Sequence, residues 1–190
     1  MYEAVKFKLT GVCPLLMHNG QLANPLNPIV RKMKEITSKR KKTDSDLMEL
    51  ARLEFMGGLY VDDKGQPCVP GELIEAMLAK GAAESKLGKK FKAGLICDGN
   101  FKLEYEGPKD ADKLWDNGKF RDTRGAKVGQ SRVMRTRPIF HDWSLIVTVQ
   151  FLPSVMNRSN VTDAMAIAGQ LVGLGDYRPK FGRFQAEVMN

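Results

Sequence analysis

Histidine and cysteine are scarce in this chain. Its 190 residues include two histidines, His18 and His141, and three widely separated cysteines, Cys13, Cys68 and Cys97. No two cysteines have the CxxC spacing, so the ligand pattern of a tetrahedral zinc site is missing. An odd number of separated thiols is typical of buried free cysteines in a reducing compartment. We therefore expect no metal, no cofactor and no disulfide.

Long apolar runs are also missing. No segment approaches the ~18 consecutive apolar residues of a membrane-spanning helix. The first residues alternate between polar and apolar types, unlike the apolar core of a signal peptide. Hydrophobic residues nevertheless make up 43% of the chain, which excludes an intrinsically disordered protein. We expect a cytoplasmic protein with no membrane partner.

The common catalytic motifs are missing as well. The sequence contains no GxSxG, no Walker loop and no HExxH. Only His18 and His141 have side chains whose ordinary pKa suits acid–base catalysis at neutral pH. Both lie in turn-like segments without a catalytic partner placed beside them in the sequence, so we favour a protein without enzymatic activity. A metal-independent endoribonuclease using His18 or His141 is kept as an alternative.

Positive charge is what the chain has in excess. Lysine and arginine number 30 against 22 acidic residues, a formal net charge of +8. A balance of this kind favours an acidic partner such as nucleic acid, although it says nothing about the fold. The most basic stretch is residues 119–137, with seven cations against one acidic residue, and residues 173–184 near the C-terminus carry three further cations.

The C-terminal segment, residues 173–184, combines glycines, cations and aromatic rings. Glycine lets the backbone adopt positive φ and lets a ligand approach it closely, while cations and rings suit phosphates and bases. We predict contacts with RNA or single-stranded DNA from Gly173, Gly175, Tyr177, Arg178, Lys180, Phe181, Gly182 and Arg183. The alternative is a helix C-cap followed by a turn, with both rings in the core.

Residues 119–137 predict an exposed basic hairpin arm centred on Gly125–Gly129. Arg135 and Arg137 are two residues apart, so they share one face of a strand. The cations expected to contact nucleic acid here are Arg121, Arg124, Lys127, Arg132, Arg135 and Arg137. We also expect residues 131–140 to pair with residues 143–151 in an antiparallel hairpin.

The order of the remaining elements predicts an α+β fold. A first strand at 2–10, a helix from Pro70-Gly71, a last helix at 161–172 and a final strand match a ferredoxin-like or RRM-like antiparallel sheet with helices on one face. Residues 27–56 are interpreted as a helical insertion, and residues 107–117 as a loop. Lys6 and Lys8 would lie on the free face of the first strand, where they could contact nucleic acid.

Two motifs resemble the RAMP superfamily, the RNA-binding subunits of CRISPR effector complexes. Val69-Pro70-Gly71 at a helix start resembles the family's first helix, and Gly173-x-Gly175 with Gly182-Arg183-Phe184 is similar to its glycine-rich loop. The chain also looks like a group of proteins encoded by bacteriophages and prophages. The resemblance implies a single RAMP-like domain over residues 1–190, with an insertion at about 27–56 and a thumb-like arm at about 119–137.

The resemblance implies binding and not cleavage, because residues 11–27 contain no aspartate where RNA-cleaving members carry one. Glu72 directly follows Gly71 and would repel phosphate at that helix start. The implied partners are RNA or single-stranded DNA, copies of the same chain, or other ribonucleoprotein subunits in a bacterial cell. A phage protein-interaction module that acts on a host complex is the remaining alternative.

Overall fold

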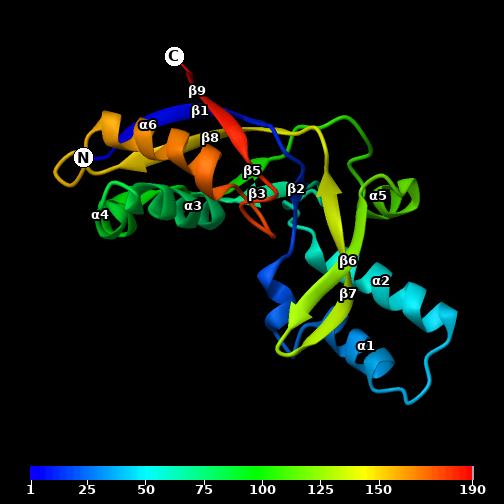
Figure 1. The fold of residues 1–190 in the computed structure, drawn as a ribbon. Coiled ribbons are helices and arrows are strands. Elements are labelled where there is room, and N and C mark those ends of the chain that lie inside the picture. The colour runs from blue at the N-terminus through cyan, green and yellow to red at the C-terminus, as the bar shows by residue number, and fades with distance from the viewer. Residues whose placement is uncertain (190) are drawn as a thin grey trace. The chain divides into compact units, whose positions relative to one another are not determined.

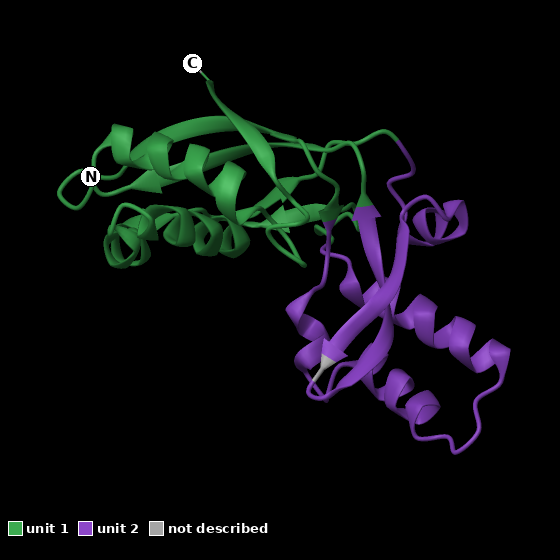
Figure 2. Ribbon diagram, in the orientation of Figure 1, with its two compact units in different colours: residues 1–15, 61–106, 140–190 green, residues 16–60, 107–139 purple. Residues whose placement is uncertain are grey.

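The computed structural model describes residues 1–189, apart from the side chain of Val128. The chain forms two compact units, which Figure 2 shows in different colours. Unit 1 consists of residues 1–15, 61–106 and 140 to the C-terminus, and unit 2 consists of residues 16–60 and 107–139. Unit 2 therefore contains both the segment predicted as a helical insertion and the segment predicted as a basic arm.

Unit 1 is built on a four-stranded sheet with the order β4-β8-β1-β9. Its strands are β1 (Glu3–Gly11), β4 (Leu95–Ile96), β8 (Ser144–Phe151) and β9 (Phe184–Met189), and all neighbours are antiparallel. Helices α3 (Gly71–Ala83) and α6 (Arg158–Ile167) lie on one side of this sheet (Figure 1). The predicted α+β fold with a ferredoxin-like antiparallel sheet is confirmed.

Strand β1 shows why the sheet has one covered and one open face. Val5, Phe7 and Leu9 are buried, whereas Lys6 and Lys8 between them are exposed, as predicted. Moving the strand by one residue would expose the three apolar side chains, each of which is stabilised by about 1.5–3 kcal/mol when fully buried. The alternation therefore fixes the register of the central strand.

The Pro70-Gly71 step lets α3 begin close to a neighbouring loop. The Gly71 N–H donates to the Gly99 carbonyl oxygen at 2.8 Å, and a Cβ on Gly71 would overlap the carbonyl oxygen of Cys97. Glycine is needed here because of this close approach. Unit 1 is completed by β3 (Cys68–Pro70) paired with β5 (Asn100–Lys102), by α4 (Gly88–Gly94) and by the π-helical turn η2 (Ala168–Val172).

The hairpin of β6 (Arg121–Val128) and β7 (Ser131–Phe140) belongs to unit 2 apart from its last residue, Phe140. Its sheet has the order β2-β7-β6, in which β2 (Leu15–Leu16) begins one residue before unit 2. The helices of unit 2 are α1 (Pro28–Thr37), α2 (Asp44–Gly58), α5 (Ala111–Asn117) and the 3-10 turn η1 (Gly20–Ala23). The two predicted insertion helices correspond to α1 and α2. Asn27 caps α1, and Thr43 forms a capping box with Asp46 at the start of α2.

The predicted pairing of residues 131–140 with residues 143–151 is wrong. Strand β7 pairs with β6 across a turn at Gly129, which has φ 58°, while β8 pairs with β1 and β4. The turn places β6 directly beside β7, so the backbone N–H and C=O groups of β7 find hydrogen-bond partners on a strand that is close in the sequence. The apolar face of β8 is covered instead by the core of unit 1, where Leu145, Val147 and Val149 are fully buried.

Two boundaries also differ from the sequence-based expectation. Part of the predicted loop at 107–117 is helix α5, whose first turn is capped by Asp110 accepting from the Lys113 N–H at 3.0 Å. The last helix starts at Arg158 and not at 161, because Asn157 and Asn160 form a reciprocal capping box. Among the described residues, no helix combines the length and apolar character needed to cross a membrane.

The buried cysteines lead to a first prediction. Burial raises the pKa of Cys68 to about 11, helped by Asp62 and Asp63, and raises the pKa of Cys97 to about 12, helped by Glu75. Because the thiolate is the reactive form, both should resist alkylation at pH 8, while half-buried Cys13 reacts. Mass spectrometry after alkylation should find one labelled cysteine in the native protein and three in urea.

The pH dependence follows from the sign of these shifts. A raised pKa keeps a thiol protonated to higher pH, so alkylation of Cys68 should rise only as the pH approaches about 11. Rapid labelling of Cys68 or Cys97 in the folded protein at pH 8, or a disulfide between any two of the three cysteines, would contradict this description of the core.

Candidate nucleic-acid interface

The glycine-rich loop of unit 1 connects η2 to β9. Gly173, Gly175 and Gly182 have φ values of 76°, 78° and 75°, a region that favours glycine. A Cβ on Gly182 would also overlap the carbonyl oxygen of Leu174. Gly175 and Gly182 therefore hold backbone conformations or close approaches that are unsuited to other residues.

Backbone hydrogen bonds hold this loop in one conformation. The Leu174 N–H donates to Gly182 O at 2.9 Å, and the Gly182 N–H donates to Pro14 O at 2.8 Å. The Leu174 side chain is buried beneath the loop. Side chains on the loop are therefore presented from a fixed backbone, which lowers the entropy cost of binding a ligand.

The two aromatic rings of the loop have different positions. Tyr177 is 46% exposed, whereas Phe181 is only 7% exposed. Their ring centroids are 5.8 Å apart in an edge-on arrangement, so Phe181 supports the Tyr177 ring from below. Of the two rings predicted to stack on a base, Tyr177 is the exposed one.

The three cations of the loop also differ. Arg178 is half-buried and its Nη1 donates to Gly173 O at 3.4 Å, a long contact that braces the loop. Lys180 and Arg183 are exposed, and Arg183 Nε donates to Pro179 O at 2.9 Å. Within the described residues the terminal amino groups of Arg183 make no hydrogen bond, so they can receive an external acceptor.

Several arginines of the basic arm are held by contacts inside unit 2. Arg121 lies over the Trp115 ring, with Cζ 4.5 Å from the ring centroid. Arg124 forms an ion pair with Asp122, its neighbour two residues away on β6. Arg121 and Arg124 were expected to contact nucleic acid, but both are engaged by side chains of unit 2.

Glu54 is the residue that the sequence analysis missed. It lies on α2 and is 6% exposed, and its carboxylate accepts from Arg135 Nη1 and from the Thr136 N–H, the latter at 2.8 Å. It therefore fixes the hairpin against α2. The signal in the sequence was a carboxylate between two apolar residues, Leu53 and Phe55. The structure shows that this part of the helix is buried.

On the β6–β7 hairpin the exposed cations are Lys127 and Arg132, which face each other across the ladder close to the Gly129 turn, and Lys119 is exposed just before β6. Arg137 is buried, with 9% of its surface exposed. The arm thus presents a pair of cations at its tip, while its other arginines lie closer to the body of unit 2.

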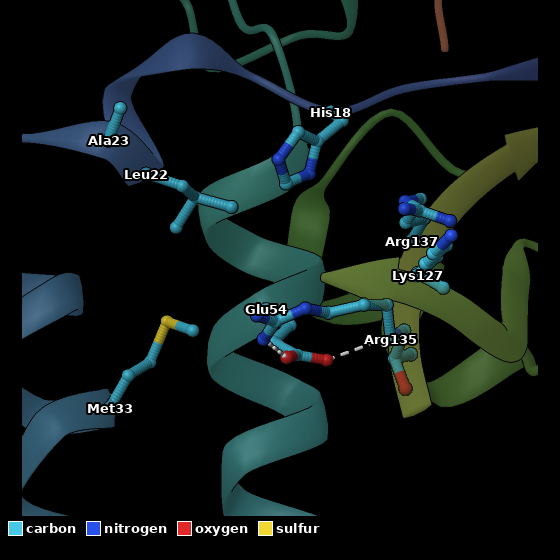
Figure 3. Close-up of a pocket in the computed structure, with 10 residues that line it drawn as sticks. His18, Leu22, Ala23, Met33, Glu54, Lys127, Arg135 and Arg137 are labelled. Carbon is cyan, nitrogen blue, oxygen red and sulfur yellow. Dashed lines mark hydrogen bonds and ion pairs between the residues drawn. The ribbon is translucent and has the colours of Figure 1, made fainter. Parts of the chain in front are cut away.

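A pocket of about 280 Å³ lies inside unit 2, against the hairpin. Figure 3 shows Lys127, Arg135 and Arg137 on one side, with His18 at another edge. The same pocket is lined by Leu22, Ala23, Met33, Glu54, Ala126 and Thr136.

The two histidines are exposed and lie in different settings. His18 lines the pocket in unit 2, and its backbone oxygen accepts from the Tyr60 hydroxyl at 3.2 Å. His141 lies in the bend between β7 and β8. Three cations, Lys127, Arg135 and Arg137, line the same pocket as His18.

The start of α3 carries negative charge. Glu72, Glu75 and Asp98 line a hollow of about 380 Å³, and Glu75 Oε1 accepts from the Cys97 N–H at 2.7 Å. These carboxylates oppose phosphate binding at this helix start, in line with the effect expected of Glu72. Across the described part of the chain, no group of three histidine, cysteine or acidic residues is arranged to hold a metal ion.

Comparison with known proteins adds information about the fold. No family model matches the chain, and no curated protein matches its sequence. The structure is similar to a chain of the cryo-EM structure of the Type III-B Cmr-beta bound to cognate target RNA, with a TM-score of 0.50 and 14% sequence identity. The match covers 100% of this chain but only 61% of that chain. At this identity the likeness shows a shared fold.

The loop geometry gives a second prediction, tested by two glycine substitutions. Gly182 and Gly65 both have positive φ, 75° and 73°, but a Cβ on Gly65 meets no atom within 4 Å. Gly65→Ala should therefore cost only the strain of the left-handed backbone, about 1–2 kcal/mol. Gly182→Ala adds a clash with the Leu174 carbonyl and should lower the free energy of unfolding by clearly more, as measured by urea denaturation. Equal losses for both variants would contradict the close packing of the loop.

Proposed function

We propose that this protein binds RNA as a single strand, without cleaving it, as a subunit of a ribonucleoprotein. The observation that carries the proposal is the glycine-rich loop, which presents Tyr177, Lys180 and Arg183 to solvent from a hydrogen-bonded backbone. Exposed rings and cations on a fixed support are the parts that single-stranded nucleic-acid sites share. Similarity to a chain in an RNA-bound complex supports the same function.

In the proposed complex, Lys180 and Arg183 hold phosphates and the Tyr177 ring stacks on a base. Tyr177 has φ 55°, a left-handed conformation that is rare for a bulky residue and costs about 1–2 kcal/mol. Residues held in such conformations are found preferentially at binding and active sites. Packing against Phe181 keeps the ring in place, so little ordering remains to be done when a base binds.

Further contacts come from exposed cations on each unit. On β1, Lys6 lies across from Thr148 and Met189, whereas Lys8 lies across from Glu187, whose carboxylate weakens its attraction for phosphate. On the arm of unit 2, Lys127 and Arg132 form the exposed pair. We assign phosphate contacts to Lys6 and to this pair, and structural roles to Arg121, Arg124 and Arg178.

One observation favours a second function, metal-independent cleavage of RNA. His18 lies in a pocket with Lys127, Arg135 and Arg137, where an imidazole could act on a bound phosphodiester. Incubation of the purified protein with end-labelled RNA in EDTA separates the two functions. Binding without cleavage supports the primary proposal, and cleavage that His18→Ala abolishes supports the second.

The third prediction concerns the loop cations. Arg183→Ala and Lys180→Ala should each weaken binding of a labelled single-stranded RNA by about 1–3 kcal/mol, as expected for a hydrogen bond to a charged group. Each should also flatten the dependence of log K on log salt by about 0.7, the value for one phosphate contact on a single strand. Fluorescence anisotropy over a salt series measures both quantities.

Lys64→Ala is the matched control, because Lys64 is an exposed lysine on a turn of the same unit. It should leave affinity and salt slope unchanged, and all three variants should melt within a few degrees of the unmodified protein. If Arg183→Ala and Lys180→Ala bind RNA as Lys64→Ala does, the loop is not the contact surface. A parallel series with DNA of the same sequence distinguishes the two nucleic acids.

A further inference from the structure

We propose that the pocket in unit 2 binds a nucleoside monophosphate, either as a free nucleotide or as the phosphorylated end of an RNA. The pocket has a volume of about 280 Å³ and is lined by α1, α2, the η1 turn and the β6–β7 hairpin. All of its lining residues belong to unit 2. It is therefore a different site from the glycine-rich loop of unit 1.

One wall of the pocket is positively charged. Lys127, Arg135 and Arg137 line the pocket against a single carboxylate, Glu54. That carboxylate already accepts from Arg135 and from the Thr136 N–H, so it is held at the hairpin and the wall keeps an excess of positive charge. The Arg137 side chain is buried in this wall, and the planar shape of a guanidinium matches phosphate oxygens.

The opposite side of the pocket is apolar. Leu22, Ala23 and Met33 face the pocket from η1 and α1, as Figure 3 shows. A ligand that is only an anion would leave this side unused, and an apolar ligand would bury the cations without a counter-charge, which is costly. A nucleoside monophosphate places its phosphate against the cations and its base against the apolar side chains.

The pocket is small. A volume of about 280 Å³ lies just below the range of small-molecule sites, about 300–1,000 Å³. One nucleotide fits such a pocket, whereas a run of several nucleotides does not. His18 is exposed at the edge of the pocket, where its ring can contact the sugar or base.

Isothermal titration calorimetry of the full chain with AMP, UMP and inorganic phosphate tests the site. We expect both nucleotides to bind about tenfold or more tightly than inorganic phosphate, because only they use the apolar side. Lys127→Ala should weaken AMP binding by about tenfold or more, as the loss of a charge-assisted contact does. No heat with either nucleotide at millimolar concentration would overturn the proposal.

Arg132→Ala is the matched control. Arg132 lies directly across the ladder from Lys127 and is exposed, but it does not line the pocket. It should bind AMP like the unmodified protein, and an equal loss in both variants would mean that only the general charge of the arm matters. Met33→Glu places a carboxylate on the apolar side and should abolish AMP binding, with circular dichroism used to verify that the variant is folded.

Competition experiments identify the source of the nucleotide. Short RNAs with a 5′-phosphate, a 3′-phosphate or hydroxyl ends are added to the AMP-bound protein. If AMP is displaced by RNA with one kind of phosphorylated end and not by the other RNAs, the pocket binds that RNA end. This assignment rests on the proposed function. AMP binding without such displacement assigns the pocket to a free nucleotide.

The two proposals fail separately. If AMP does not bind while long RNA binds and responds to Arg183→Ala, the pocket proposal alone is wrong. If AMP binds and responds to Lys127→Ala while long RNA does not bind, the proposed RNA-binding function alone is wrong.

Discussion

The pairing of β1 with β8 and β9 is the constraint on which unit 1 depends. Alternating burial along β1 fixes its register, and the strand leads directly into residues 11–14. The glycine-rich loop is bonded to that continuation, because the Gly182 N–H donates to Pro14 O and the Val12 N–H donates to Arg183 O at 2.8 Å. The core of the sheet thus determines where the loop presents its ring and cations.

Unit 2 depends on a different interaction, the buried carboxylate of Glu54. A buried charge is costly unless it is paired and hydrogen-bonded, and Glu54 meets both conditions through Arg135 and the Thr136 N–H. The hairpin is thereby attached to α2, and the pocket beside it acquires a cationic wall. Because Arg135 is paired with Glu54, it is less available to nucleic acid than Lys127 and Arg132 are.

Local patterns in the sequence predicted the elements that local physics determines. The alternation in β1, the helices α1 and α2, and the special backbone of Gly175 and Gly182 could all be recognised from neighbouring residues. The pairing of β7 could not, because two strands competed for it and only the complete core decides. The ion pair of Arg135 could not be predicted either, because Glu54 is 81 residues away in the sequence. Composition alone also could not show that Phe181 is buried while Tyr177 is exposed.

The central claim is that the loop between η2 and β9 contacts a single strand of RNA through an exposed ring. Photo-crosslinking with RNA that carries 4-thiouridine, followed by mass spectrometry of the digested protein, tests it most directly. The account predicts that crosslinks concentrate on the peptide containing Tyr177 and that they decrease strongly in Tyr177→Ala, with the fold intact. Efficient crosslinking elsewhere with none to residues 173–184, or no crosslinking at all, would contradict it.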